Sequence, residues 1–191
     1  MVRRSHPRGA LVLLLLASGA SLLAAAASAQ RTARDPQRLV LRSADLPAAF
    51  RPYESRYISN AMARGYFGYT AGRENGYIVT FVKGKVRSPT ASVSSIAEVY
   101  RQPRHAHGAM QSFIRESRKM NNPRELVVGA RLGDEARMYR ETLGRYVHYV
   151  LGWRSGSVMA TLVVASAHGA MSASQAVAFA QAQQAREEAA G

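Results

Sequence analysis

In the last third of the chain, hydrophobic and polar positions alternate with a period of two, and this pattern predicts β-strands. It covers residues 136–142, 145–153 and 158–165. The segment 154–157 between the last two contains Gly and Ser and is typical of a tight hairpin turn. We therefore expect three consecutive antiparallel strands. One face of the middle strand carries large apolar side chains, at Val147, Tyr149, Leu151 and Trp153.

Further strands are predicted in the first half of the chain, at residues 53–59, 77–82 and 93–100. Residues 77–82 are dense in β-branched and aromatic side chains and lie between two glycines, which favours a strand. Residues 60–76 contain four glycines. We expect this stretch to be irregular, apart from one helical turn at 61–64.

Two helices are predicted from apolar residues spaced three and four apart. The first begins at Pro103, because proline fits the first turn of a helix, and extends to Met120. The second begins after Ser172, which forms a capping box with Gln175. We expect this second helix to fray through its polar end. Its inward stripe is Ala173, Ala176, Val177, Phe179 and Ala180, and its polar end contains Gln183, Arg186 and Glu187.

The order of these elements predicts an α+β fold, a mostly antiparallel sheet with helices packed on one face. Residues 39–188 are assigned to this single domain, and the polar residues 30–38 to a flexible leader. A chain of this length can bury a substantial core without covalent staples. The sequence contains no cysteine, which excludes disulfides and thiol chemistry.

The N-terminus has the three parts of a secretory signal peptide. Arg3, Arg4 and Arg8 precede an apolar run at residues 10–27, and small residues close it at Ala27-Ser28-Ala29. We predict that residues 1–29 are a cleaved signal peptide and that the mature chain is secreted or extracytoplasmic. The alternative is an uncleaved N-terminal helix that anchors the protein, since the run is near the minimum length that spans a bilayer. After cleavage no transmembrane span is expected.

The chain is strongly basic, with a formal net charge of +14. Only three of its cations are lysines, so the charge is almost wholly arginine, which grips carboxylates and phosphates in bidentate fashion. This composition favours an anionic partner in the envelope, a polymer or a lipid headgroup, and we do not expect nucleic acid to be that partner. The alternative is that the arginine excess reflects the base composition of the genome.

One segment combines aromatic and cationic side chains on a glycine-rich backbone. Aromatic rings beside guanidinium groups suit sugars, nucleobases or anionic headgroups. The alternative is that the tyrosines are half-buried in strands with arginines lying alongside. The candidate ligand-binding residues are Arg51, Tyr53, Arg56, Tyr57, Arg64, Tyr66, Tyr69 and Arg73.

Catalytic and metal-binding patterns are weak. His105 and His107 are two residues apart, a spacing that points them away from each other on a helix. Ser155 stands one position off the nucleophile-elbow pattern and in a predicted turn. Nothing in the sequence pairs the carboxylates that could hydrolyse a polymer. We therefore predict no catalytic residue, no metal and no cofactor. The carboxylates considered for polymer hydrolysis are Glu54, Glu74, Glu98, Asp134, Glu135 and Glu141.

Several short motifs resemble a group of secreted or lipid-anchored bacterial proteins of unknown function. They are the strings at 44–50, 133–136, 153–156 and 160–164, followed by the closing Ala- and Gln-rich helix. The chain is also distantly similar to the extracellular sensor domain of mycobacterial serine/threonine kinases and to the PsbP-like sandwich. The resemblance implies an α+β domain with a concave sheet that binds a ligand. The chain departs from both groups in lacking cysteine.

The sequence thus favours a secreted, non-catalytic binding or sensor-like domain of the bacterial cell envelope, monomeric or weakly associating. The rival hypothesis is a small extracytoplasmic hydrolase that acts on envelope polymer. A third is a purely structural interaction domain. The identity of a ligand does not follow from the residues.

Overall fold

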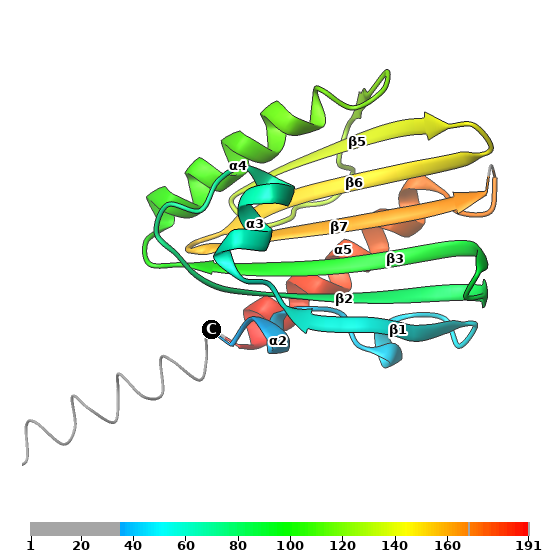
Figure 1. Cartoon of the computed structure of the whole chain (residues 1–191), viewed down its shortest axis with the longest axis horizontal. Helices are drawn as coiled ribbons and strands as arrows, with labels where there is room; N and C mark the ends of the chain where they lie inside the picture. Colours follow the sequence, from blue (N-terminus) through cyan, green and yellow to red (C-terminus); the bar gives the residue numbers. More distant parts are fainter. Residues whose placement is uncertain (1–34, 168, 191) are drawn as a thin grey trace, which may run out of the picture. The chain divides into compact units, whose positions relative to one another are not determined.

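Seven strands form one antiparallel sheet in the computed structural model, which describes residues 35–167 and 169–190 (Figure 1). Their order across the sheet is β1-β2-β3-β7-β6-β5-β4, and each neighbouring pair runs antiparallel. This confirms the α+β class with a mostly antiparallel sheet. The strands are β1 (Phe50–Tyr57), β2 (Arg73–Lys85), β3 (Ser88–Tyr100), β4 (Arg124–Leu126), β5 (Glu135–Leu143), β6 (Tyr146–Ser155) and β7 (Val158–Ala167).

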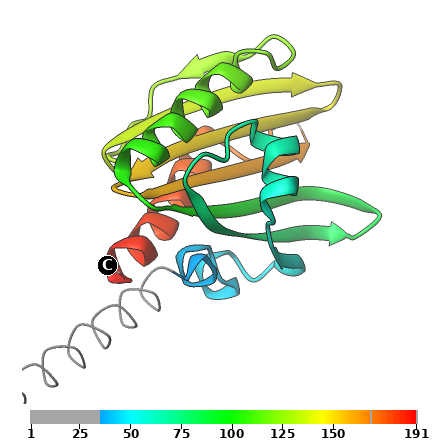
Figure 2. The same cartoon turned by 60° about the vertical axis from the view of Figure 1, so that its left-hand side comes forward.

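Helices cover both faces of the sheet, whereas the sequence led us to expect them on one (Figures 1 and 2). Successive strand residues point to opposite faces, and in β6 Gly152 lies against Phe113 of α4 whereas Trp153 contacts Glu187 of α5. The central strands β3 and β7 are buried along most of their length, so both of their faces need a cover. The helical elements are α2 (Pro36–Leu39), the 3₁₀ turn η1 (Ser43–Asp45), α3 (Asn60–Phe67), α4 (Pro103–Ser117) and α5 (Ala173–Ala189).

The main core lies between the sheet and the layer made by α5 and the segment from α2 to η1. Trp153, Leu151, Leu162 and Val93 are completely buried in it, and the ring of Phe179 packs there from α5. Smaller clusters lie under α4 and under α3 on the other face. Each helical layer therefore packs on its own apolar patch of the sheet.

The predicted start of α5 is confirmed and its predicted end is wrong. Ser172 and Gln175 form the capping box, but the helix continues in register to Ala189. Gln183 is fully buried, donating from Nε2 to the Ile96 carbonyl at 3.0 Å and accepting from Ser95 Oγ at 2.7 Å. A polar side chain whose hydrogen bonds are satisfied by the sheet can occupy a core position, and spacing alone does not reveal this.

The stretch at 60–76 is more ordered than expected. Ser59 caps α3 by accepting from the Met62 amide, and Gly68 ends it in the left-handed conformation at φ 69°. Residues 36–38, assigned to the leader, form α2 together with Leu39, and Pro36 and Leu39 are buried. The predicted signal peptide at 1–29 lies outside the described residues. Within the described ranges, no helix is both long and apolar enough to cross a membrane.

Candidate functional site

The predicted binding residues on β1 lie at an open edge of the sheet. Arg51 and Tyr53 are exposed, and Tyr53 sits where the pairing of β1 with β2 slips by one residue. Arg56 forms an ion pair with Glu54, two residues away on the same strand. These side chains are accessible, but none of them lines either of the grooves described below.

Arg73 is buried, in contrast to the predicted ligand-binding role. Its Nε lies 2.5 Å from Glu98 Oε1, and its Nη1 donates to the Ile58 carbonyl at 2.9 Å and to Asn60 Oδ1 at 2.8 Å. Burial raises the pKa of Glu98, and the neighbouring guanidinium of Arg73 opposes that rise. Arg73 therefore ties the start of α3 to the sheet and is closed to a ligand.

The remaining predicted residues are dispersed. Arg64 is exposed on α3, and the side chain of Tyr66 lies outside the described part of the structure. Tyr69 packs on the ring of Tyr100 at a centroid distance of 6.3 Å. It also lies over Gly108 of α4, where a Cβ would meet its hydroxyl at 2.4 Å. None of the eight residues lines the groove described next, but Tyr57 contacts two residues that do.

A groove of about 600 Å³ lies between the N-terminal segment and the first two strands. Alternate residues of β2 face it, and opposite them stand Val40 and Leu41. Arg38 and Arg42 add positive charge at its rim. The floor is apolar and aromatic, consisting of Tyr77, Val79 and Phe81, and the other lining side chains are polar, namely Asp35, Gln37, Ser43 and Ser55, beside Pro52.

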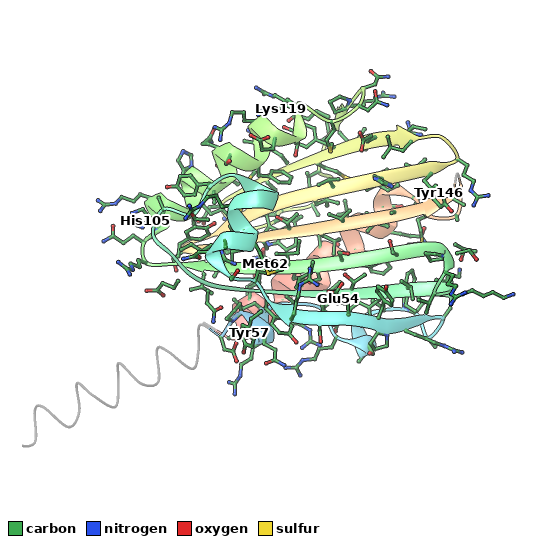
Figure 3. All side chains as sticks on the ribbon, viewed as in Figure 1. Glu54, Tyr57, Met62, His105, Lys119 and Tyr146 are labelled. Carbon is green, nitrogen blue, oxygen red and sulfur yellow. The ribbon has the colours of Figure 1, made fainter. Side chains whose placement is uncertain are left out.

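Tyr57 contacts the N-terminal wall of the groove (labelled in Figure 3). Its hydroxyl donates to Asp35 Oδ1 at 3.2 Å and lies 3.3 Å from Gln37 Oε1. Its ring meets that of Tyr77 edge-on, with centroids 5.0 Å apart. Desolvation and the Asp35 carboxylate raise the pKa of Tyr57, so this hydroxyl remains a donor near neutral pH. The contact joins α2 to the edge strand.

The N-terminal wall of the groove is held by buried hydrogen bonds. The Leu41 amide donates to Ser95 Oγ at 3.0 Å, and Ser95 in turn donates to Gln183 of α5. Further along, Arg186 grips Asp45 in a bidentate pair, Nε to Oδ2 at 2.6 Å and Nη2 to Oδ1 at 2.8 Å. The groove is therefore pre-formed by contacts from α5 and β3.

The rim carries more positive charge than its partners neutralise. Partial burial acts to raise the pKa of Asp45, but Arg186 and Arg42 together hold it below its usual value. Arg38 and Arg42 are exposed and belong to none of the ion pairs among the described residues. Both also line a neighbouring groove of about 430 Å³ whose other wall is made of α5 alanines.

Sequence reasoning missed Arg38 and Arg42 because it assigned the first to a leader. Their spacing is nonetheless visible: two arginines flank the apolar triplet at 39–41. That triplet indicates a buried segment. Arginines on either side of a buried segment extend their charged ends to the protein surface, where they can lie near each other. The pocket itself has no sequence signal, because its floor is contributed by a strand forty residues away.

Side chains weighed for catalysis are engaged elsewhere. Each of the six carboxylates singled out above lies within 4 Å of a side-chain nitrogen of an Arg or His. His105 is half-buried against Gly72, whereas His107 Nδ1 is 3.5 Å from Glu135. Ser155 donates to Glu187 Oε2 at 3.1 Å. Across residues 35–167 and 169–190, no group of three or more His, Cys, Asp or Glu is placed to hold a metal ion.

The comparisons with known proteins concern the fold. No protein-family model matches the chain, and no curated protein matches it. Among solved structures it is similar to the extracellular domain of PknH from Mycobacterium tuberculosis, with a TM-score of 0.60 and 9% sequence identity. The match covers 80% of this chain and 94% of that one. This likeness supports the resemblance to the mycobacterial kinase domains at the level of fold.

Proposed function

We propose that this protein is a non-catalytic binding domain of the extracytoplasmic space that takes a small amphiphile with an anionic group. The single observation behind the proposal is the groove between residues 35–43 and strands β1 and β2. Its apolar floor accepts a hydrocarbon or ring, and its two exposed guanidinium groups pair with a phosphate or carboxylate at the rim.

The energetics favour a ligand with both parts. A rim arginine alone contributes little in water, because exposed ion pairs are screened. Burying a short alkyl chain on Tyr77, Val79 and Phe81 contributes about 0.8 kcal/mol per CH₂. The charge then sets orientation, with the anionic head at Arg38 and Arg42 and the tail on the apolar floor of the groove.

Two independent considerations support a location outside the cytoplasm for this binding. The first thirty residues have the composition of an export signal, and the structural neighbour is by its title an extracellular domain. A pre-formed groove beside which the described residues assemble no catalytic group suits capture or sensing rather than turnover. The kinase neighbour shares the fold, and the sensor-like role of this chain is part of our proposal.

Isothermal titration with decyl phosphate, below its aggregation concentration, tests the proposal on the full chain. We expect saturable binding with a stoichiometry near one. Replacing Arg38 and Arg42 together by Gln should weaken it about tenfold or more, since two charge-assisted contacts are lost. Ser55→Phe should weaken it further by filling the groove.

The matched control is Arg56→Gln with Arg64→Gln, which removes the same charge from exposed positions outside the groove. This pair should change the affinity by less than about twofold. Decanol, with the same tail and no charge, should bind more weakly than decyl phosphate. Equal loss in both double variants, or equal affinity for decanol, would contradict the proposed site.

A further inference from the structure

Two hairpin turns lie at the same end of the sheet, at the right-hand side of Figure 1. One joins β2 to β3 and the other joins β5 to β6. A continuous row of pairs connects their bases: Lys83 with Ala91, Ala91 with Ser166, Ser166 with Val147, and Val147 with Thr142. The hairpin centres are three strand spacings apart, about 14 Å. They therefore present one surface, which we call the tip surface.

Cations on the tip surface form no ion pair with the acidic side chains that the structure describes. Lys83, Lys85 and Arg87 come from the first hairpin and Arg145 from the second, and all four are exposed. None belongs to the ion pairs formed among the described residues, which engage cations elsewhere. Two of the three lysines in the chain lie on the tip surface.

The nearest carboxylates on the neighbouring strands are already engaged. Glu54 of β1 pairs with Arg56. Glu141 of β5 is buried, accepts from the Asn121 amide at 2.6 Å and faces His148. The field at this end of the molecule is therefore positive, and no local side chain cancels it.

Apolar side chains project among these cations. Val86, at the turn of the first hairpin, is 57% exposed, and Leu143, at the second, is 40% exposed. Next to Leu143, the guanidinium of Arg145 lies 5.2 Å from the ring centroid of Tyr146 and donates to its hydroxyl (Tyr146 is labelled in Figure 3). An apolar tip, a stacked tyrosine and free cations are the parts that membrane interfaces attract.

We propose that the tip surface docks the protein on an anionic lipid bilayer. The cations Lys83, Lys85, Arg87 and Arg145 contact headgroup phosphates, and Val86 and Leu143 enter the headgroup boundary. A soluble anionic polymer would satisfy the cations but offers nothing to the projecting Val86 and Leu143. This surface shares no residue with the groove, so the two proposals can be tested independently.

Vesicle co-sedimentation tests the proposal, using the full chain in the form that the expressing cell leaves it. Any retained leader is then common to every variant. We expect binding to equimolar phosphatidylcholine and phosphatidylglycerol and much weaker binding to phosphatidylcholine alone. Lys85→Ser, Arg87→Ser and Arg145→Ser together should lower partition to the anionic vesicles roughly a hundredfold. Binding should also fall steeply with added salt.

A charge-matched triple variant is the control: Arg64→Ser, Arg104→Ser and Arg131→Ser, all exposed and away from the tip surface. It should lower partition by less than about threefold. The uncharged change Val86→Ser with Leu143→Ser should lower vesicle partition about tenfold and leave binding to poly-L-glutamate unchanged.

Three outcomes would overturn the docking surface. They are no preference of the unaltered chain for anionic vesicles, equal losses in the two triple variants, and a Val86/Leu143 variant that partitions normally. Circular dichroism and the urea midpoint verify folding of each variant. If a triple variant is misfolded, Arg87→Ser and Val86→Ser singly carry the same test with smaller expected losses.

Discussion

Arg73 and Glu98 show how much a single residue's setting changes its role. In the sequence Arg73 belongs to a basic, aromatic stretch that suggests ligand contact. In the fold its side chain is 1% exposed and that of Glu98 3% exposed. A buried pair of this kind is costly to break and need not stabilise the fold when compared with apolar replacements.

Replacing Arg73 by Met should lower the free energy of unfolding by about 3–5 kcal/mol, because Glu98 is left buried without its partner. Urea unfolding followed by circular dichroism measures the loss. The double variant Arg73→Met with Glu98→Met should recover most of it. A double variant as unstable as the single one would show that the guanidinium contacts to Ile58 and Asn60, rather than the pair, dominate.

Glu187 is the second residue whose environment decides its chemistry. Its Oε2 accepts from Trp153 Nε1 and Ser155 Oγ, each at 3.1 Å, while its buried Oε1 has no hydrogen-bond partner. Burial raises the pKa of Glu187 to about 8, against the lowering effect of these two donors. The carboxyl is therefore largely neutral at pH 7.

The raised pKa of Glu187 makes stability depend on pH in a defined direction. The folded state holds this proton more tightly than the unfolded state, so its contribution is complete below about pH 4.5 and is lost as pH rises to about 8. Glu187→Gln, which keeps an acceptor and stays neutral, should be as stable as the parent at pH 4.5. At pH 8 it should be more stable by about a few kcal/mol. A variant whose urea midpoints track the parent at every pH would refute the assignment.

At the scale of elements, small residues set how closely the helices approach the sheet. Gly152 of β6 lies directly under Phe113 of α4, and a Cβ there would come within 2.5 Å of the ring. Phe113 also contacts Tyr139 of β5, with ring centroids 6.1 Å apart. The lack of a side chain at residue 152 therefore sets how closely α4 packs on this face of the sheet.

Gly152→Ala should lower the free energy of unfolding by about 1–3 kcal/mol, because the Phe113 ring has to move out of its packed position. Hydrogen exchange should show faster opening of α4 and little change in α5, which lies on the other face. Gly65→Ala is the control: no atom lies within 4 Å of its Cβ position in α3, so alanine should raise stability by about 0.5–1 kcal/mol. Equal effects of the two substitutions would argue against this packing role.

At the scale of the whole molecule, the N-terminal segment is part of the domain. Leu39, Val40 and Leu41 are only 2–3% exposed and close the core between α5 and β2. The hydrogen bonds from Leu41 to Ser95 and from Arg186 to Asp45 fasten this segment to the fold. The same contacts build the wall of the proposed groove.

A chain that begins at residue 35 retains this segment and is the reference for stability. One that begins at residue 42 should lose roughly 5 kcal/mol, because three buried aliphatic side chains are removed. The shorter chain should also lose decyl phosphate binding, since Arg38 and one wall go with it. Unchanged binding by the shorter chain would place the ligand elsewhere.

Local patterning determined much of this protein in advance. Alternation at 145–153 set which face of β6 is buried, and the Ser172 capping box set where α5 begins, because both depend on residues close in sequence. The antiparallel α+β class followed from the order of such elements.

Tertiary structure alone decided the rest. The burial of Gln183, Arg73 and Glu187 depends on partners far away in the chain, and a polar side chain does not reveal by itself that it will find one. The distribution of helices over both faces, the groove beside Arg38 and the shared end of two hairpins arise from strand order across the sheet. Strand order depends on pairing between segments far apart in the chain. The spacing of hydrophobic positions within one segment carries no information about that pairing.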